Sequence, residues 1–251
     1  MPRFFVERTN EHTAVISGTD AHHLRTVLRL RPGDKLTVID GTQQAFQAEL
    51  TAYEGESALV RLLSPELLAR EAQLDVYLVQ GIAKGEKMDW IVQKAVELGV
   101  AGVIPLDAKH SVVKIAADKE KSRCERWQRI AAEAAKQCCR LQVPAVYPVT
   151  KLSDVWKLLP AGCVCLFCDE AAAQGEALPG MKQTLRALTD AAAVAVFVGP
   201  EGGFSREEAL QAVSQGAQRV SLGPRVLRTE TAAIAAVTMV MYELADIGGE
   251  A

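Results

Sequence analysis

Runs of consecutive apolar residues constrain the fold of this chain more than any other feature of its sequence. Residues 164–167 and 194–198 are apolar throughout, and 219–222 is interpreted as a further strand of this kind. A strand with one face in water alternates apolar and polar residues, whereas the strands of parallel sheets are covered on both faces and do not alternate. Residues 87–98 and 119–137, in contrast, carry apolar residues at helical spacing. The sequence therefore predicts an α/β domain whose parallel sheet has helices on both faces. Further strands of this domain are expected at 74–79 and 103–106.

The first 70 residues have a different pattern from the rest of the chain, because short strand-like runs alternate there with turns. Proline, glycine and aspartate indicate turns at 31–34 and 40–41. Several short strands at this spacing predict a small β-barrel that includes one short helix at 22–30. The polar residues 65–72 are expected to form a linker, which gives a barrel over 1–70 and an α/β domain over 73–251. The expected barrel strands are 13–17, 35–39, 44–50 and 57–63.

Charge and composition exclude several classes of protein. The formal net charge is −3, so any contact with nucleic acid has to come from a local patch. Basic residues outnumber acidic ones over 84–140, which indicates either such a patch or a solvated helix face. The chain has neither a signal-peptide pattern nor an apolar run of the roughly 20 residues that a membrane helix needs, so we expect a cytoplasmic protein without a membrane partner. Cys163, Cys165 and Cys168 lack a second ligand pair for zinc, so no metal site is predicted.

A glycine-rich turn, Gly-Pro-Glu-Gly-Gly at 199–203, follows the predicted strand 194–198. Ser205 and Glu208 have the spacing of a capping box, so a helix is expected to begin at Ser205. Ligands of parallel sheets bind at such strand ends, where glycines expose backbone N–H and C=O groups. The spacing matches neither a phosphate-binding P-loop nor a dinucleotide turn. Glu201 would repel a phosphate, so the turn either binds a zwitterionic or cationic ligand or is simply a tight turn.

A second glycine-proline pair, Gly223-Pro224, follows the next predicted strand. It precedes four polar residues and then a helix at 231–245 that is rich in alanine, whose small side chain lets backbones approach closely. Two loops of this kind after successive strands would face one another across one cleft. The polar residues are Arg225, Arg228, Thr229 and Glu230.

These two loops resemble those of a known family. Residues 198–204 (VGPEGGF) and 222–232 (LGPRVLRTETA) are similar to the signature loops of SPOUT methyltransferases, and most similar to the RsmE-type family, which methylates N3 of a uridine in 16S ribosomal RNA. The resemblance implies a trefoil-knotted methyltransferase domain after a PUA-like RNA-binding barrel. It also implies S-adenosylmethionine as cofactor, 16S ribosomal RNA or the small ribosomal subunit as partner, and a homodimer. The resemblance continues through 2–5, 23–34, 40–41, 84–88, 93–94, 97–99 and 133–144.

Two short segments depart from the family pattern. The family more often has Glu-Arg-Ser where this chain has Lys-His-Ser at 109–111. It often has Gln-Ser-Gly-Arg where this chain has Gln-Cys-Cys-Arg at 137–140. These departures concern local RNA contacts, to which His110 could contribute, more than the fold or the cofactor.

The resemblance implies that the cofactor lies between the two loops. Leu222, Val226 and Leu227 would form apolar walls for the adenine, and backbone amides of the loops would bind its polar edge. The sulfonium is cationic, so Glu201 or Glu230 would attract it. The alternative role of Glu201 is a hydrogen bond that braces the loop. The residues expected to contact the cofactor are Val198, Gly199, Glu201, Gly202, Leu222, Gly223, Val226, Leu227 and Thr229.

Methylation of N3 requires that the N3 proton be removed or that the forming anion be stabilised. We expect Arg228 to stabilise this negative charge, and Glu230 is the weaker candidate, as the base. The alternative for both residues is a structural ion pair with each other. The target uridine would flip out of its stack, and basic side chains would bind the RNA phosphates unless they are merely solvated charges. These side chains are Arg3, Arg25, Arg29, Arg31, Lys84 and Lys87.

The helix at 231–245 is apolar nearly all round, which requires that it be buried. An interface with a second copy of the chain would bury it, and Trp90 and Trp127 suit the core or such an interface. His22 and His23, at an expected helix start, are interpreted as surface or capping residues. Two other functions stay open. One is a nucleotide-dependent enzyme of ordinary doubly wound type, such as a reductase, and the other is a non-catalytic RNA-binding or ribosome-assembly factor.

Overall fold

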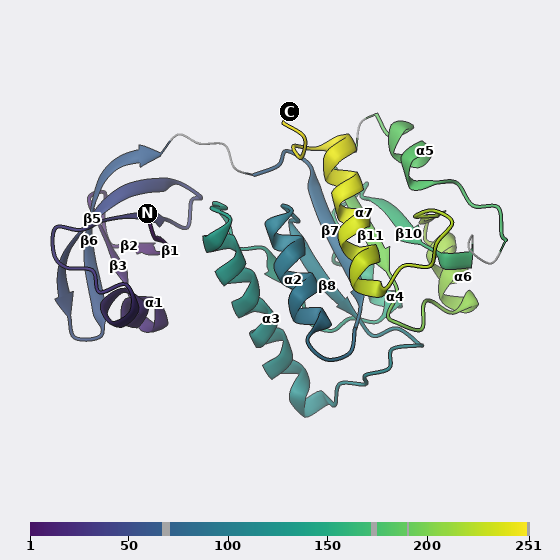
Figure 1. The fold of residues 1–251 in the computed structure, drawn as a ribbon, viewed down its shortest axis with the longest axis horizontal. Coiled ribbons are helices and arrows are strands. Elements are labelled where there is room, and N and C mark those ends of the chain that lie inside the picture. Colours follow the sequence, from purple (N-terminus) through teal and green to yellow (C-terminus); the bar gives the residue numbers. More distant parts are fainter. Residues whose placement is uncertain (67–70, 172–174, 190, 250–251) are drawn as a thin grey trace. The chain divides into compact units, whose positions relative to one another are not determined.

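The computed structural model describes residues 1–66, 71–171, 175–189 and 191–249 (Figure 1). The chain divides into two compact units. The first comprises residues 1–71 together with 135–142, and the second comprises 72–134 and 143–251. The predicted division near residue 70 did not include the return of 135–142 to the first unit. None of the described helices combines the length and the apolar character needed to cross a bilayer.

The first unit is built on one curled sheet with the strand order β1-β4-β5-β6-β3-β2. Strands β1 and β2 stand at opposite ends of this order, yet Val6 alone separates them in the chain. The sheet therefore has to curl until its two edges approach, which confirms the predicted small barrel. The elements of this unit are β1 (Arg3–Phe5), β2 (Glu7–Arg8), β3 (Thr13–Ile16), α1 (Gly18–His22), the π-helical turn η1 (His23–Val27), β4 (Lys35–Ile39), β5 (Ala45–Glu54) and β6 (Ser57–Glu66).

Two predictions for the first unit were wrong in their boundaries. The single helix expected at 22–30 is instead α1 followed directly by η1, so His22 and His23 lie at the junction of two helical turns and not at a helix start. Leu24, in η1, is completely buried in the core of the barrel. The expected linker began too early, because β6 continues through Glu66, where the Glu66 carboxylate pairs with Arg3 at 3.0 Å.

The second unit contains an all-parallel sheet with the order β12-β10-β11-β7-β8-β9, as the apolar runs predicted. Every residue of β11 is buried. Its Ala195 and Phe197 pack in a cluster with residues of α4 and α6, while α7 packs against β11 and β7 and contacts α2 and α5 (Figure 1). Both faces of the sheet are thus covered. The elements are β7 (Asp75–Gly81), α2 (Lys87–Glu97), β8 (Gly102–Leu106), α3 (Ala117–Gln137), β9 (Ala145–Val146), α4 (Leu152–Val155), β10 (Val164–Cys168), α5 (Met181–Arg186), β11 (Ala193–Val198), α6 (Arg206–Ser214), β12 (Gln218–Val220) and α7 (Thr229–Leu244). The last residues of α3, from 135 on, are counted with the first unit.

The helix ends agree with the sequence in two places and differ in one. Gly99 follows α2 with a φ of +98°, as a C′ glycine should. Ser205 caps α6, since its hydroxyl accepts from the Glu208 N–H at 3.2 Å and the Glu208 carboxylate accepts from the Ser205 N–H at 2.8 Å. Helix α7, however, begins at Thr229 and not at the predicted Thr231, with Arg228 as its N-cap residue. The polar residues of the second loop therefore include the first turn of a helix.

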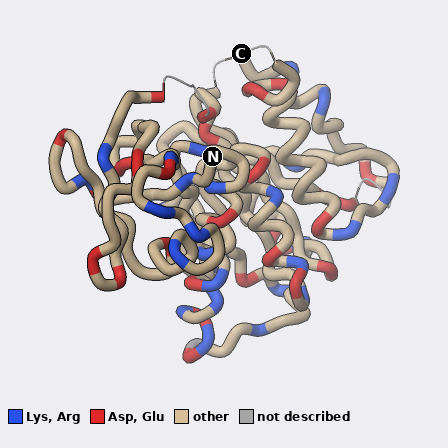
Figure 2. Tube along the Cα trace, turned by 60° about the vertical axis from the view of Figure 1, so that its left-hand side comes forward, with Lys and Arg blue, Asp and Glu red and all other residues tan. Residues whose placement is uncertain are grey.

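Basic residues of the region 84–140 are largely balanced by acidic partners. Lys94 pairs with Glu97, Lys114 with Asp107 and Lys109 with Glu207, while Arg126 pairs with Asp89. Figure 2 shows Lys and Arg interspersed with Asp and Glu along the chain. This pattern favours the solvated helix face over a concentrated basic patch in this region.

The C-terminus of α3 contains one of the departures from the family pattern. The Arg140 N–H donates to the Ala135 carbonyl at 2.9 Å and the Cys139 N–H to the Lys136 carbonyl at 3.4 Å, which are the two hydrogen bonds of a Schellman motif. Cys139 has a φ of +67°, in the left-handed region that costs an L-residue roughly 1–2 kcal/mol. The glycine that the family often has at this position would avoid this cost.

Replacement of Cys139 by glycine is expected to raise the free energy of unfolding by about 0.5–1 kcal/mol. The gain is smaller than the relieved strain, because glycine also increases the entropy of the unfolded chain, by about 0.4–1 kcal/mol. Urea unfolding followed by circular dichroism measures the difference. Cys138→Gly is the matched control: Cys138 does not adopt a positive φ, so this variant should be no more stable than the wild type. Equal effects of the two substitutions would contradict the explanation.

Candidate functional site

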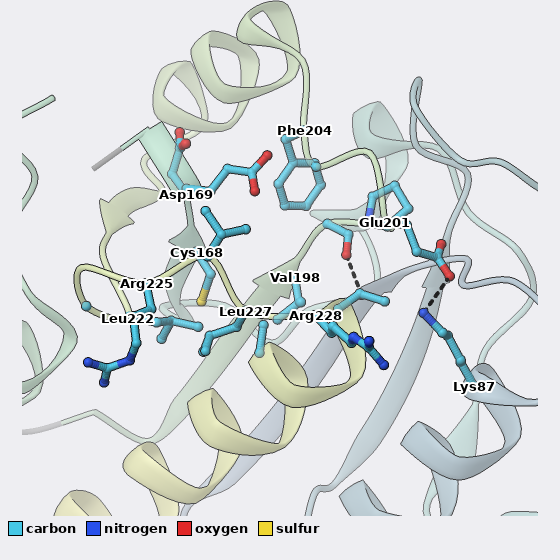
Figure 3. Close-up of a pocket in the computed structure, with 18 residues that line it drawn as sticks. Lys87, Cys168, Asp169, Val198, Glu201, Phe204, Leu222, Arg225, Leu227 and Arg228 are labelled. Atoms are coloured by element: carbon cyan, nitrogen blue, oxygen red, sulfur yellow. Dashed lines mark hydrogen bonds and ion pairs between the residues drawn. The ribbon is translucent and has the colours of Figure 1, made fainter. Parts of the chain in front are cut away.

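A cavity of about 320 Å³ lies at the carboxyl ends of the central strands of the second unit, within the usual size range of small-molecule sites. Three segments of chain line it: 168–170 at the end of β10, 198–204 after β11 and 222–229 after β12 (Figure 3). Lys87 from α2 and Ala232 from α7 complete the wall. Because the strands are parallel, all three segments emerge at the same edge of the sheet.

The two glycine loops line one cavity, as predicted. The strands that precede them, β11 and β12, were expected to be neighbours in the sheet, but they are not. Strand β10 lies between β11 and β12 in the sheet. Its end therefore contributes Cys168, Asp169 and Glu170 to the cavity, and sequence reasoning missed all three residues. The two adjacent acids directly after an apolar run were the signal that could have found them.

Close packing explains the glycines of the first loop. Gly203 has a φ of +65°, and a Cβ atom there would lie 2.3 Å from Oε1 of Glu170. A Cβ atom on Gly202 would lie 2.9 Å from the Cβ of His110, and one on Gly199 would lie 3.1 Å from the backbone of Gly203. The turn thus folds tightly on itself and against His110. The His110 Nδ1 lies 3.2 Å from the Gly202 carbonyl and has to carry the proton in this contact, because a carbonyl only accepts.

The residues predicted to contact the cofactor line the cavity, with the exception of Gly202, which packs against His110. Phe204, which was not predicted, joins the cavity to the core, because its ring centroid lies 4.1 Å from that of Phe167. Across the cavity the hydroxyl of Thr229 donates to the Gly199 carbonyl at 2.6 Å, a hydrogen bond that links the two loops. The other lining residues that were not predicted are Pro200, Gly203, Arg225 and Ala232.

Lys87 lies between a carboxylate of the loop after β11 and a carboxylate of the first turn of α7. Its Nζ is 3.3 Å from Oε1 of Glu201 and 3.2 Å from Oε2 of Glu230, and Figure 3 shows the ammonium directed at Glu201. The backbone N–H of Lys84 donates to the same Glu201 oxygen at 3.0 Å. The loop-bracing hydrogen bond considered for Glu201 is therefore present. Glu230 pairs with Lys87 and not with Arg228.

These contacts hold the charges of the site in place. Burial alone would raise the pKa of Glu201, but the hydrogen bond from Lys84 and the ammonium of Lys87 outweigh it and lower the pKa below its ordinary value. Contact with Glu230, and then with Glu201, raises the pKa of Lys87. Burial and the neighbouring Asp169 raise the pKa of the Cys168 thiol to about 12, so Cys168 is a neutral wall of the cavity and not a nucleophile.

Arg228 is exposed at the rim of the cavity, at the N-cap position of α7. In the part of the chain that the structure describes, neither Arg228 nor Arg225 forms an ion pair, so both guanidinium groups can meet an incoming anion. Asp169, in contrast, is held by Arg219 at 2.8 Å. No group of three or more His, Cys, Asp or Glu residues among those described could hold a metal ion.

The basic residues proposed for RNA differ in their surroundings. Arg3 pairs with Glu66. Arg25 donates to the Gly55 carbonyl at 3.0 Å and stacks over the ring of Tyr53 at 4.4 Å. Arg29, Arg31 and Lys84 are exposed, and their side chains form no ion pair with another described residue.

Comparison with known proteins identifies the family. Residues 70–241 match the family described as "RNA methyltransferase domain", and residues 16–63 match "RNA methyltransferase PUA domain". Ribosomal RNA small subunit methyltransferase E of Bacillus subtilis (strain 168) is 33% identical over 258 aligned positions that cover 100% of both chains.

The chain belongs to this RNA methyltransferase family, of the RsmE type.

Solved structures of the family extend the likeness to three dimensions. Ribosomal RNA small subunit methyltransferase E from Neisseria gonorrhoeae, solved with bound S-adenosyl methionine, is 33% identical with a TM-score of 0.84, over 98% of this chain and 99% of that one. A Legionella pneumophila methyltransferase in complex with the bound cofactor SAM is 31% identical with a TM-score of 0.80, over 98% of this chain and 100% of that one. Both units of the chain therefore follow the RsmE-type fold, a PUA-like domain followed by a parallel-sheet methyltransferase domain.

Replacement of Lys87 by methionine is expected to raise the pKa of Glu201. In the wild type the folded-state pKa lies below the ordinary value of 4.5. Ionised Glu201 therefore adds to the free energy of unfolding above pH 4.5, and this contribution is lost as the pH falls through the folded-state pKa. The contribution should be smaller in Lys87→Met. A carboxyl-carbon NMR titration of Glu201 in both proteins measures the two pKa values.

Lys94→Met is the matched control for this titration. Lys94 lies on the same helix and pairs with Glu97 at 2.8 Å, outside the cavity, so its loss should leave the pKa of Glu201 unchanged. An unaltered Glu201 pKa in Lys87→Met would mean that the Lys84 N–H alone holds this carboxylate ionised.

Proposed function

We propose that this protein transfers the methyl group of S-adenosylmethionine to N3 of a specific uridine in 16S ribosomal RNA, in the cytoplasm, during ribosome biogenesis. The observation that carries the proposal is the single cavity lined by both signature loops. Support comes from full-length relatives named as small-subunit ribosomal RNA methyltransferases and from the cofactor-bound relatives of the same fold.

The residues of the cavity fit this cofactor. Val198, Leu222 and Leu227 offer apolar walls for the adenine, and the loops offer backbone amides and carbonyls. Glu201 and the acids at the end of β10 give the cavity a negative side that suits a sulfonium and an α-ammonium group. The same carboxylates would repel the phosphates of a dinucleotide or of ATP. Lys87, Arg225 and Arg228 line the same cavity, so the choice of the methyltransferase over an ordinary nucleotide-dependent enzyme rests on the cofactor-bound relatives.

Methyl transfer to uridine converts a cationic sulfonium into a neutral thioether and releases the N3 proton. The cavity has to align N3, the methyl carbon and the sulfur in line, and such orientation can contribute about 7–11 kcal/mol. Arg228, exposed at the rim and without an ion pair among the described residues, would stabilise the negative charge that forms on the uracil ring. Glu230 is the candidate acceptor of the proton, although Lys87 already neutralises part of its charge.

The RNA would contact basic side chains of both units. Arg29 and Arg31 of the PUA-like unit and Lys84 of the second unit are the strongest candidates for phosphate contacts, because they are exposed and outside the described ion pairs. Arg3, Arg25 and Lys87 would have to exchange or share their present partners. A small set of local contacts is consistent with the acidic net charge of −3.

A second copy of the chain is the proposed partner of the helical face formed by α2 and α7. These helices pack against each other and leave the large apolar side chains of Trp90, Met239 and Tyr242 exposed by 43%, 37% and 65%. Trp127, by comparison, is 1% exposed and belongs to the core. A homodimer would cover these three exposed side chains of α2 and α7.

Arg228→Ala is expected to lower kcat about 10²–10³-fold, the scale seen when one donor to a developing anion is removed, while the Kd for S-adenosylmethionine stays unchanged. Methylation of small subunits that lack the modification is followed by mass spectrometry of the nucleosides, with N3-methyluridine as the product. Arg225→Ala is the matched control, because Arg225 also lines the cavity and is exposed, and should affect kcat less. A wild-type protein that forms no N3-methyluridine would refute the function, whereas full activity of Arg228→Ala would refute only the role of Arg228.

The doubly substituted variant Trp90→Glu/Tyr242→Glu is expected to be monomeric, because charges would replace two exposed apolar side chains of the proposed interface. Analytical ultracentrifugation should give twice the chain mass of 27.1 kDa for the wild type and the single chain mass for the variant. Leu210→Glu serves as control, since Leu210 is 61% exposed on α6, away from α2 and α7. If Leu210→Glu were monomeric instead, the interface would lie at α6 and not at α2 and α7.

A further inference from the structure

Gln80 is a completely buried polar residue near the end of β7 that the function described above does not use. It pairs in register with Val198, the last residue of β11 before the glycine turn. Its side-chain Nε2 lies 2.8 Å from the Gly81 carbonyl, 2.9 Å from Oγ1 of Thr229 and 3.5 Å from the Gly199 carbonyl. Gln80 does not line the cavity, but two of its partners do.

The orientation of the Gln80 amide is determined by these partners. Carbonyl oxygens only accept hydrogen bonds, so the NH₂ group and not the oxygen has to face Gly81 and Gly199. The hydroxyl hydrogen of Thr229 is used toward Gly199 at 2.6 Å, which leaves its oxygen to accept from Gln80. The two hydrogens of the NH₂ group therefore go to the Gly81 carbonyl at 2.8 Å and to Oγ1 of Thr229 at 2.9 Å, and the Gly199 carbonyl is bonded mainly by the Thr229 hydroxyl.

The oxygen of the same amide forms no hydrogen bond with the described residues. This oxygen, Oε1 of Gln80, is buried, and an unpaired buried acceptor costs about 1–3 kcal/mol. An apolar side chain of similar size would avoid this cost. The value of glutamine at this position therefore lies in what its NH₂ group holds together.

What Gln80 holds together is the pair of loops that form the cavity. Gly199 belongs to the turn after β11, and Thr229 is the first residue of α7, 30 positions later. The end of β7 also seats the first loop directly: a Cβ atom on Gly81 would lie 2.5 Å from the ring and the nitrogen of Pro200. Gln80 is completely buried and Thr229 is 5% exposed, so the hydrogen bond between them is stronger than the same bond would be in water.

We propose that Gln80 is a positioning residue for the cofactor, which holds the two loops at the spacing that admits S-adenosylmethionine. It acts through Thr229 and Gly199 and does not touch the cofactor itself. The inference rests on the proposed function, since it names what keeps that same site competent to bind. Loss of the NH₂ group leaves the loops free to separate, and binding then has to reorder them.

Gln80→Met tests the inference, because methionine has a similar length and removes both the NH₂ group and the unpaired oxygen. The Kd for S-adenosylmethionine, measured by calorimetry on the full chain, is expected to rise about tenfold, which corresponds to about 1.4 kcal/mol. The kcat at saturating cofactor is expected to stay within about threefold of the wild type, and the melting temperature should change little. A combined Gln80→Met/Thr229→Val variant should show less than the product of the two single effects on Kd, because both residues act through one set of hydrogen bonds.

Gln128→Met is the matched control. Gln128 also bonds backbone groups with both ends of its amide: its Nε2 donates to the Pro144 carbonyl at 3.0 Å and its Oε1 accepts from the Val146 N–H at 2.8 Å. Both partners lie away from the cavity. It should lower the melting temperature without changing the Kd. Wild-type binding together with an unchanged Kd in Gln80→Met, or an equal rise of Kd in Gln128→Met, would overturn the inference alone. A wild-type protein that does not bind S-adenosylmethionine would overturn the proposed function, and the inference with it.

Discussion

The parallel pairing of β10 with both β11 and β12 is the constraint on which the site depends. Parallel strands end at one edge of the sheet, so three segments that are far apart in sequence emerge together there. The cavity needs no long insertion, because the loops have only to turn from strand to helix. The cost is close backbone packing within and between the loops, which the glycines at 199, 202 and 203 allow. The same residues that look like a binding motif in the sequence are thus first required by the fold.

Charge gives this cavity its chemical preference. Carboxylates come from the end of β10, from the loop after β11 and from the first turn of α7, and ion pairs with Lys87 and Arg219 hold Glu201, Glu230 and Asp169 in place. An ion-paired carboxylate attracts a cation less than a free one does, but its side chain is held in one position. The site therefore keeps a fixed polarity, with acids on one side and Arg228 at the rim. This polarity suits a donor that begins as a cation and an acceptor that becomes an anion.

Sequence reasoning recovered what local patterns encode. Apolar runs predicted β7, β10 and β11, and the Ser205–Glu208 spacing predicted the start of α6. The resemblance of the two loops identified the family and half of the residues that line the cavity. It failed where the arrangement depends on partners distant in the chain. Nothing near residue 168 indicates that β10 lies between β11 and β12, and nothing near Lys87 indicates that its ammonium meets Glu201 and Glu230. Cys139 is a different case. The end of α3 places this residue in the left-handed region, which favours glycine, although the chain has cysteine there.

Two tethers of different chemistry join the same two loops. The inner one, through Gln80 and Thr229, is neutral and buried, so it is insensitive to salt and to pH near neutrality and can set the spacing of the loops. The outer one, through Lys87, is charged and partly exposed, so salt weakens it, and it also lowers the pKa of Glu201. A cavity that must admit and release a ligand of this size at each turnover gains from such a division. The charge of the outer contact can respond to the change of the ligand from sulfonium to thioether under the proposed function, whereas the neutral inner contact does not depend on that charge.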